Sequence, residues 1–252
     1  MSAPTDHSRP FGYRLAIRLV RPLLMLLTRR SWSGSEHLPR EGGWVVCPNH
    51  VSHLDPLVFA HFMVDHGLSP RFLGKRELFD TPGVGAVLRS ADQIPVERES
   101  RRASGAYRAA VEAVRSGRCV AIYPEGTLTR DPGLWPMRGK TGAARVALET
   151  RRPVVPVAVW GPEEVLPPYS RLPRLLPRRT MHVRVGPPVA LEDLYGSPVT
   201  TDLLTEATRR IMDAITRELE VLRDERAPVE RFDPRRAGVT RIGRPRRLRD
   251  AS

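Results

Sequence analysis

Short apolar runs alternate with stretches of helical character along most of this chain, and the alternation limits the folds that the chain can adopt. The apolar runs centre near Val45, Phe72, Ile94, Val120, Val157 and Val183. Helical character is strongest at residues 57–66, 100–116, 139–150 and 202–223. Strands that alternate with helices are typical of α/β domains, in which helices cover the faces of a sheet. The sequence therefore predicts one α/β domain with a mixed, mostly parallel sheet, and 252 residues suffice for a sizeable core.

The two ends of the chain differ from this central part. Residues 224–252 are rich in arginine, aspartate and proline, and they hold too few apolar residues to form a core. The first residues have a basic amphipathic pattern instead. We therefore expect an amphipathic helical segment over residues 1–38, the α/β domain over residues 39–223 and a disordered basic tail over residues 224–252.

The chain carries an excess of positive charge, with 41 lysines and arginines against 28 acidic residues and a formal net charge of +13. In residues 11–30, Arg14, Arg18 and Arg21 share one helical face and leucines occupy another. These arginines and Pro22 interrupt the apolar run, which disfavours a helix that crosses a bilayer. Two interpretations stay open: the helix lies on an anionic membrane surface, or it packs on the domain's own core. The charge of the tail suits lipid headgroups, nucleic acid or simple solubility.

Two residues that follow the first apolar run suit acid–base chemistry. Residues 49–55 read NHVSHLD. An imidazole has an ordinary pKa of about 6.5, and a nearby carboxylate fixes its tautomer and stabilises the imidazolium. His50 and Asp55 can form this pair only across a turn, because five residues of regular helix would set them about 140° apart. The alternatives are that Asp55 only caps a helix and His50 is an ordinary loop histidine, or that His53 takes the carboxylate.

A second apolar run, residues 119–123, also leads directly into polar residues. It is followed by Pro124, Glu125, Gly126 and Thr127. Taken alone these residues indicate a turn, because proline presets φ and glycine accepts a positive φ. Ligands of open α/β sheets, however, bind outside the carboxyl ends of the strands. Two strand ends that both deliver polar groups therefore indicate a ligand site.

Together these segments resemble the PlsC-type glycerolipid acyltransferases, the family of 1-acylglycerol-3-phosphate acyltransferases. Residues 49–55 satisfy the family's first block, Asn-His-x-Ser-x-x-Asp, in full. The other similar segments are, in chain order, residues 75–79, 91–98, 123–129 and 155–159. The third block is usually Phe-Pro-Glu-Gly-Thr-Arg-Ser, and here Leu128 stands in place of its arginine. The resemblance covers about residues 40–190.

The resemblance implies roles for individual residues, with His50 as the general base and Asp55 as its partner. The residues it implies in substrate binding are Asn49, Ser52, Lys75, Arg98, Glu125, Gly126, Thr127 and Arg130. A phosphorylated acceptor needs fixed cations, and guanidinium is the better bidentate partner, so Arg98 takes the specific role and Lys75 a supporting one. Glu125 either accepts a hydrogen bond from an acceptor hydroxyl or orients nearby cations. Leu128 removes one phosphate contact, which Arg130 could replace.

The resemblance implies an acyltransferase that moves a fatty acyl group from acyl-CoA or acyl carrier protein to the free hydroxyl of a lysophospholipid, in the first instance 1-acylglycerol-3-phosphate. We expect no cofactor besides that co-substrate, no metal site, no nucleic-acid partner and a peripheral location on the cytoplasmic face of the plasma membrane. Three alternatives stay open: another lysolipid or glycolipid as acceptor, a thioester hydrolase with Cys47 as nucleophile, and a basic binding protein without catalysis. Cys47 and Cys119 both lie in apolar runs, which suits free thiols.

Overall fold

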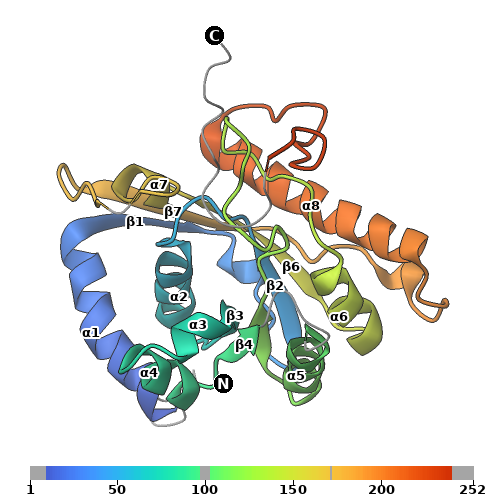
Figure 1. The fold of residues 1–252 in the computed structure, drawn as a ribbon, viewed down its shortest axis with the longest axis horizontal. Coiled ribbons are helices and arrows are strands. Elements are labelled where there is room, and N and C mark those ends of the chain that lie inside the picture. Colours follow the sequence, from blue (N-terminus) through green and yellow to red (C-terminus); the bar gives the residue numbers. More distant parts are fainter. Residues whose placement is uncertain (1–9, 97–102, 171, 240–252) are drawn as a thin grey trace.

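The computed structural model describes residues 10–96, 103–170 and 172–239. Within these ranges seven strands form one sheet in the order β1-β7-β6-β2-β5-β3-β4. Their bounds are β1 Thr28–Ser33, β2 Trp44–Pro48, β3 Arg71–Lys75, β4 Ile94–Val96, β5 Cys119–Ala121, β6 Val154–Trp160 and β7 Arg179–Val185. Neighbouring strands run parallel except β6 and β7, which are antiparallel. The predicted α/β class with a mixed, mostly parallel sheet is confirmed (Figure 1).

The central strands are apolar throughout because both of their faces are covered by helices. From β2, Val45 and Cys47 pack into a core cluster with helices α5 (Ala103–Arg115), α6 (Gly142–Thr150) and α8 (Thr201–Arg223). Trp44 and Val46 point to the other face, where α2 (Asp55–Asp65) supplies Phe59, Phe62 and other apolar side chains. These four helices lie close to the stretches that the sequence predicts.

The remaining helices cover one edge of the domain and its loops. Helix α1 (Phe11–Leu27) packs against α4 (Val84–Ser90) and α2. Short helices follow β3 and β6 as α3 (Arg76–Phe79) and α7 (Pro162–Val165), and two single 3₁₀ turns are η2 (Ser35–His37) and η3 (Glu192–Leu194). In the described part of the chain, no helix has both the length and the apolar character needed to cross a membrane.

Among the described strands, β1 is the one that the sequence did not predict. Its six residues include two arginines and two serines, and most of its side chains are exposed or half-buried. It pairs with β7 at the edge of the sheet, where Trp32 lies opposite Val183. An edge strand with a polar outer face produces no apolar run, which is why its sequence gives no strand signal. Residues 28–33, assigned above to the N-terminal segment, therefore belong to the sheet.

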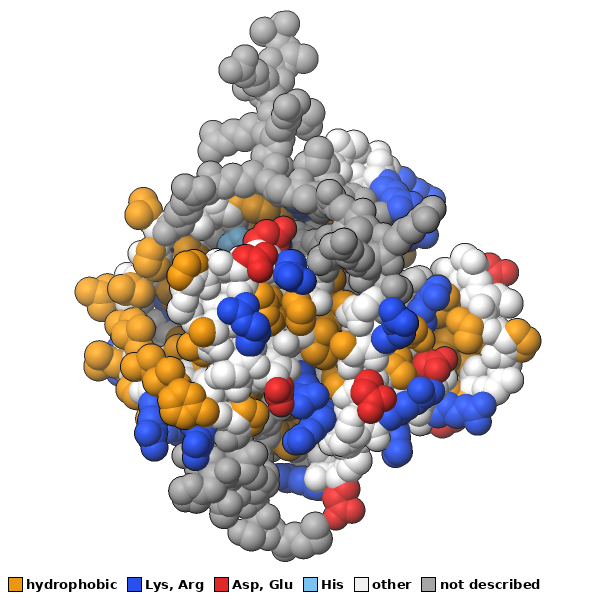
Figure 2. Space-filling view, turned by 60° about the horizontal axis from the view of Figure 1, so that its bottom comes forward, with side chains coloured by type: hydrophobic (Ala, Val, Ile, Leu, Met, Phe, Trp, Pro, Cys, Tyr) orange, Lys and Arg blue, Asp and Glu red, His pale blue; other side chains and the backbone are white. Residues whose placement is uncertain are grey.

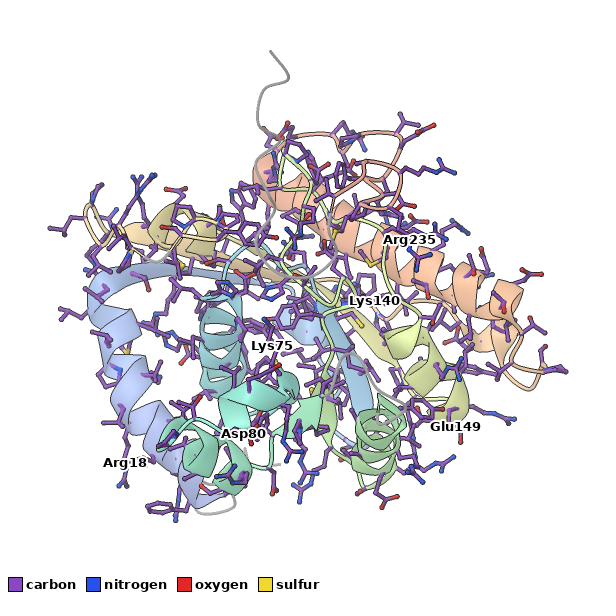
Figure 3. The ribbon with its side chains drawn as sticks, viewed as in Figure 1. Arg18, Lys75, Asp80, Lys140, Glu149 and Arg235 are labelled. Carbon is purple, nitrogen blue, oxygen red and sulfur yellow. The ribbon has the colours of Figure 1, made fainter. Side chains whose placement is uncertain are left out.

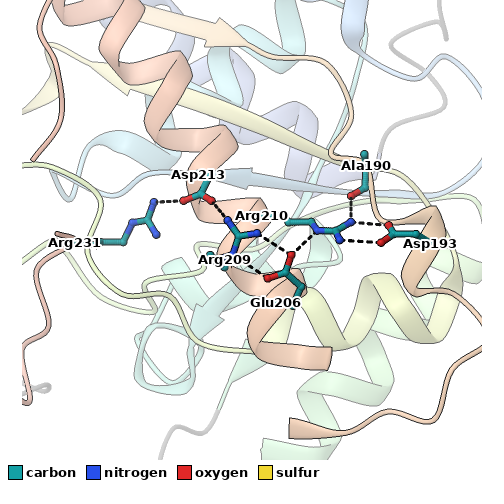
Figure 4. A network of polar contacts seen from close by, with 7 residues as sticks. All are labelled: Ala190, Asp193, Glu206, Arg209, Arg210, Asp213 and Arg231. Carbon is teal, nitrogen blue, oxygen red and sulfur yellow. Dashed lines mark hydrogen bonds and ion pairs between the residues drawn. The ribbon is translucent and has the colours of Figure 1, made fainter. Parts of the chain in front are cut away.

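Residues 224–239, assigned above to the tail, fold back against the domain. The backbone N–H of Arg138 donates to the carbonyl of Phe232 at 3.0 Å. Arg231 pairs with Asp213 at 2.8 Å, and so joins a network of charges along α8 (Figure 4). The members of this network are Asp193, Glu206, Arg209, Arg210, Asp213 and Arg231. The cluster of arginines at residues 244–249 lies outside the described residues.

Candidate active site

The two polar segments that follow β2 and β5 meet at one edge of the sheet. The two strands are neighbours and pair in parallel, with Val46 opposite Ala121. Beyond the strands, the N–H of Thr129 donates to the carbonyl of His50 at 2.7 Å. The carboxyl ends of adjacent parallel strands thus bring residues 49–55 and 124–130 into contact, as the sequence predicts.

His50 and Asp55 form a hydrogen-bonded pair in this region. Nδ1 of His50 lies 2.9 Å from Oδ2 of Asp55. The same carboxylate oxygen accepts hydrogen bonds from the backbone N–H groups of Val51 (2.6 Å) and Ser52 (2.8 Å), because residues 51–54 form a tight turn before α2. Asp55 is fully buried, and burial raises the pKa of its carboxyl while the hydrogen bonds from His50, Ser52 and Val51 oppose the rise.

The ring of His50 is held on its other sides as well. Its centroid lies 4.3 Å from that of Tyr123, at the end of β5. Among the described residues, no side chain or backbone group bonds to Nε2, and only 15% of the His50 side chain is exposed. His50, and not its local competitor His53, therefore takes the carboxylate, and it presents one nitrogen away from Asp55. The pKa of His53 is lowered by burial first and then by the charges of His50 and Lys75.

Asn49 and Ser52 anchor the turn that carries His50 to neighbouring backbone segments. The side-chain amide of Asn49 donates to the carbonyl of Val159 (3.0 Å) and accepts from its N–H (2.7 Å), which ties the turn to β6. The hydroxyl of Ser52 donates to the carbonyl of Leu166 at 2.7 Å. Both side chains are buried and form these hydrogen bonds with the protein's own backbone. Neither is among the residues that line the neighbouring cavity.

Glu125 also bonds to backbone groups. Its Oε1 accepts from the N–H of His50 and its Oε2 from the N–H of Met137, each at 3.1 Å. The side chain is 1% exposed, and burial raises the pKa of its carboxyl to about 8. This geometry joins the turn that carries His50 to the loop that follows β5. The sequence suggested contacts with a substrate hydroxyl or with cations, and it gave no sign of this link between two backbone segments.

A cavity of about 750 Å³ opens beside His50. Its walls are mostly apolar and come from α1, α2, α3, α4 and the ends of β3 and β5. From α1 the lining residues include Ala16, Ile17, Val20 and Leu24. Gly126 and Thr127 line it near the histidine. A cavity with long apolar walls and a titratable pair at one end suits a substrate that joins a hydrocarbon chain to a polar reactive group.

Three cationic side chains of the described residues line this cavity, namely Arg21, Lys75 and Lys140. Arg21 is paired with Asp65 at 3.0 Å, between α1 and α2. Lys75 ends β3, whereas Lys140 precedes α6, and Figure 3 shows both projecting toward the centre of the molecule. Gly126 has φ +69°, and a Cβ there would lie 2.7 Å from Nζ of Lys140. Glycine at position 126 therefore satisfies the backbone and leaves room for this lysine.

Arg130, another predicted cation, lies away from the cavity. Arg130 is 8% exposed, its guanidinium lies 4.9 Å from the centroid of the Tyr169 ring, and it is not among the cavity-lining residues. Leu128 does line the cavity. Arg98 lies outside the described residues, and its role stays a prediction.

The thiol of Cys47 lies in the hydrophobic core. It is fully buried among residues such as Val45 and Val120, and burial raises the pKa of the thiol. Cys119 is buried on the other face of the sheet. Within the described ranges, no group of His, Cys, Asp and Glu side chains has the arrangement of a metal site.

Comparison with known proteins places this architecture in one family. A model of the family described as Acyltransferase matches residues 29–160. The chain is similar to the 1-acyl-sn-glycerol-3-phosphate acyltransferase of Bacillus subtilis (strain 168), at 24% identity over 212 residues that cover 83% of this chain and 100% of that protein. It is also similar to the chloroplastic 1-acyl-sn-glycerol-3-phosphate acyltransferase BAT2 of Brassica napus, at 30% identity over 70% of this chain and 47% of that protein.

The fold has a counterpart among solved structures. The crystal structure of the 1-acyl-sn-glycerophosphate (LPA) acyltransferase PlsC from Thermotoga maritima superimposes with a TM-score of 0.66 and 22% identity. The alignment covers 86% of this chain and 81% of the other. The family match spans more than half of the chain and includes both polar segments. The chain therefore belongs to the acyltransferase family.

Proposed function

We propose that this protein transfers a fatty acyl group from acyl-CoA or acyl carrier protein to the free hydroxyl of 1-acylglycerol-3-phosphate and so produces phosphatidate. The observation that carries the proposal is the His50–Asp55 pair, with its 2.9 Å hydrogen bond, at the wall of a large apolar cavity that also exposes Lys75 and Lys140. The relatives named as acyltransferases for this acceptor support the same substrate class.

In the proposed reaction His50 is the general base. Because Nδ1 is held by Asp55, Nε2 accepts the proton of the acceptor hydroxyl as its oxygen attacks the thioester carbonyl. The new C–O bond forms, the C–S bond breaks, and the proton passes from the imidazolium to the departing thiolate. Asp55 keeps the tautomer fixed and stabilises the imidazolium. The acyl group moves directly to the acceptor without a covalent enzyme intermediate.

The cavity separates the two parts of the substrates by their chemistry. Its apolar walls, which include Ile17, Val20 and Leu24 of α1, suit the hydrocarbon chain. The ammonium groups of Lys75 and Lys140 suit the phosphate of the acceptor, and Arg98 joins them according to the family resemblance. Leu128 leaves the phosphate one guanidinium short of the usual family pattern, so the lysines carry more of its recognition here.

The proposal is tested by an assay of the purified protein with radiolabelled acyl-CoA, acyl carrier protein thioester and a panel of acceptors. We expect transfer to lysophosphatidate in preference to lysophosphatidylcholine, glycolipids and monoacylglycerol. Transfer to none of these, or equal transfer to acceptors with and without phosphate, would contradict it.

The same assay separates acyl transfer from thioester hydrolysis through Cys47. A nucleophilic cysteine needs an accessible thiolate, whereas the Cys47 thiol is fully buried and its pKa is raised. We expect Cys47→Ser to retain acyl transfer, and we expect single-turnover trapping to yield no acylated Cys47. An acyl-Cys47 adduct would favour the hydrolase.

We also propose a peripheral location on the cytoplasmic face of the plasma membrane. One face of α1 lines the cavity, while Phe11, Leu19 and Leu26 on its other face are 68%, 67% and 69% exposed. The helix therefore packs on its own domain and still offers an apolar surface to lipid. Deleting residues 1–30 is a poor test of this, because it removes a wall of the cavity and part of β1.

A further inference from the structure

The loop between α7 and β7 exposes leucines to an unusual degree. Leu172 is 80% exposed, Leu176 is 81% exposed and Leu175 is 41% exposed. Exposed leucines are ordinary when scattered, but three within five residues form a local apolar patch. The described residues of this loop, 172–178, are exposed throughout.

This loop lies beside the exposed face of α1. The guanidinium of Arg178 donates from Nη2 to the carbonyls of Met25 and Thr28, both at 2.8 Å, which fixes the base of the loop to the C-terminal end of the helix. Figure 1 shows the loop projecting at the same edge of the molecule as α1. We call this edge the apolar edge and define it by Leu19, Leu23, Leu26, Leu172 and Leu176. Figure 2 shows hydrophobic side chains gathered on that side of the molecule, with Lys and Arg side chains beside them.

The two segments that form the apolar edge contain arginines and no acidic residue. Residues 11–30 contain five arginines and no acidic residue, and residues 172–179 contain three arginines and no acidic residue. Three of these arginines pair with carboxylates of neighbouring elements, Arg21 and Arg30 with Asp65 and Arg179 with Glu164, which leaves an excess of positive charge. Exposed leucines beside this excess of arginine match the anionic headgroups and apolar interior of a membrane surface. Protein interfaces, in contrast, deplete charge at their centres and place it at a polar rim. Charge complementarity therefore favours a lipid bilayer as the occupant.

We propose that the loop at residues 172–178 is a second membrane-docking element, which inserts Leu172 and Leu176 into the same leaflet as the outer face of α1. Two separated contacts fix the orientation of the domain on the bilayer, whereas α1 alone would allow it to roll about the helix axis. The opposite face of α1 lines the cavity, so this orientation holds the cavity one helix away from the lipid. The inference rests on the proposed function only in taking the substrate to be a lipid. Docking on vesicles is measured without any acyl transfer.

The test uses the full chain and sedimentation with vesicles. Leu172→Ser/Leu176→Ser is compared with the parent on vesicles of phosphatidylcholine and phosphatidylglycerol in equal parts, and on phosphatidylcholine alone. Each leucine withdrawn from the membrane removes apolar burial, so we expect the partition coefficient to fall about tenfold or more. The matched control is Val199→Ser/Val221→Ser, which changes two residues that are 52% and 59% exposed beside and on α8. We expect it to bind like the parent.

Further measurements separate the other outcomes. The melting temperature should be unchanged in both double variants, because all four positions are exposed. We expect Arg174→Gln to weaken binding to the anionic vesicles and not to phosphatidylcholine alone. Unchanged vesicle binding by Leu172→Ser/Leu176→Ser would overturn the proposal. If the two substitutions instead convert a parental dimer to a monomer and leave vesicle binding unchanged, the leucines form a dimer interface, and the proposal is overturned as well.

Acyl transfer in detergent micelles keeps the two proposals distinct. We expect the leucine variant to retain it, because neither leucine lines the cavity. If the parent transfers no acyl group in micelles, the proposed function is contradicted. If the leucine variant nevertheless binds vesicles more weakly than the parent, the docking element is still supported.

Discussion

Nδ1 of His50 lies 2.9 Å from Oδ2 of Asp55, and the carboxylate is completely buried. Two backbone N–H groups donate to the same oxygen, so they hold the Asp55 carboxylate in position independently of its hydrogen bond with His50. An imidazole held in this way keeps one tautomer and directs its other nitrogen outward. The chemistry proposed for the site depends on that arrangement.

Asp55→Asn tests the orienting role of the carboxylate. The amide has nearly the same shape, but it is neutral and presents an N–H₂ group where the carboxylate presents an acceptor. We expect kcat to fall about 10²–10⁴-fold with little change in KM for either substrate, since the imidazolium loses its partner. Steady-state kinetics measure this split. A loss confined to KM would assign Asp55 to substrate binding.

Glu125→Gln tests the link between the turn and the loop after β5. Above pH 8 the carboxyl is ionised, and both of its oxygens accept backbone N–H groups, from His50 and from Met137, whereas glutamine has one acceptor oxygen. One buried N–H then faces an amide donor, and we expect unfolding to become easier by about 1–3 kcal/mol. We expect kcat to fall as well, because the backbone N–H of His50 loses its hydrogen-bond acceptor. Glu112→Gln, on the exposed face of α5, is the control, and equal stability of the two variants would contradict this account.

Lys75→Met and Lys140→Met test phosphate recognition. A hydrogen bond to a charged group contributes about 1.5–3 kcal/mol, so each variant should lose about tenfold or more in kcat/KM with lysophosphatidate. With monoacylglycerol, which has no phosphate, parent and variants should react alike. Arg145→Gln, on the exposed side of α6, controls for general charge. The same fractional loss with both acceptors would show that the lysines do not bind the phosphate.

The buried carboxyl of Glu163 is expected to make the stability of the protein depend on pH. Both of its oxygens accept from the N–H of Gly161, and burial raises the pKa of its carboxyl from 4.5 to about 8. Between these two values the folded protein retains a proton that the unfolded chain releases, so the free energy of unfolding falls as pH rises. Glu163→Gln removes this contribution and should show a shallower decline from about pH 5 to pH 8 in chemical denaturation. Parallel curves for parent and variant would refute it.

The sequence predicts the central fold because that part of the chain has a regular pattern. Apolar runs mark the six strands near Val45, Phe72, Ile94, Val120, Val157 and Val183, and they are clearest in the central strands β2, β5 and β6, which are buried on both faces. Strand β1 escapes detection because it is a polar edge strand. The pairing of His50 with Asp55 is also predictable, because the turn before α2 is the one geometry that joins them.

Other features of the site depend on tertiary contacts that leave no local signal. Glu125 bonds to two backbone groups, and backbone partners cannot be inferred from residue types. Helix α1 forms a wall of the cavity because it is apolar on two faces, whereas the pattern of residues 11–30 shows only that it is basic and amphipathic. Asn49 and Ser52 match the first block of the family, yet their side chains bind the protein's own backbone.

His50→Ala tests the central claim most directly. The variant is first shown to melt like the parent, with His37→Ala, at a half-exposed position, as the matched control. Transfer of labelled acyl groups from acyl-CoA to lysophosphatidate is then measured under single-turnover conditions. If His50 removes the hydroxyl proton, the rate falls about 10²–10⁴-fold in His50→Ala and not in His37→Ala. A folded His50→Ala protein that acylates the lipid at the parental rate would contradict the mechanism.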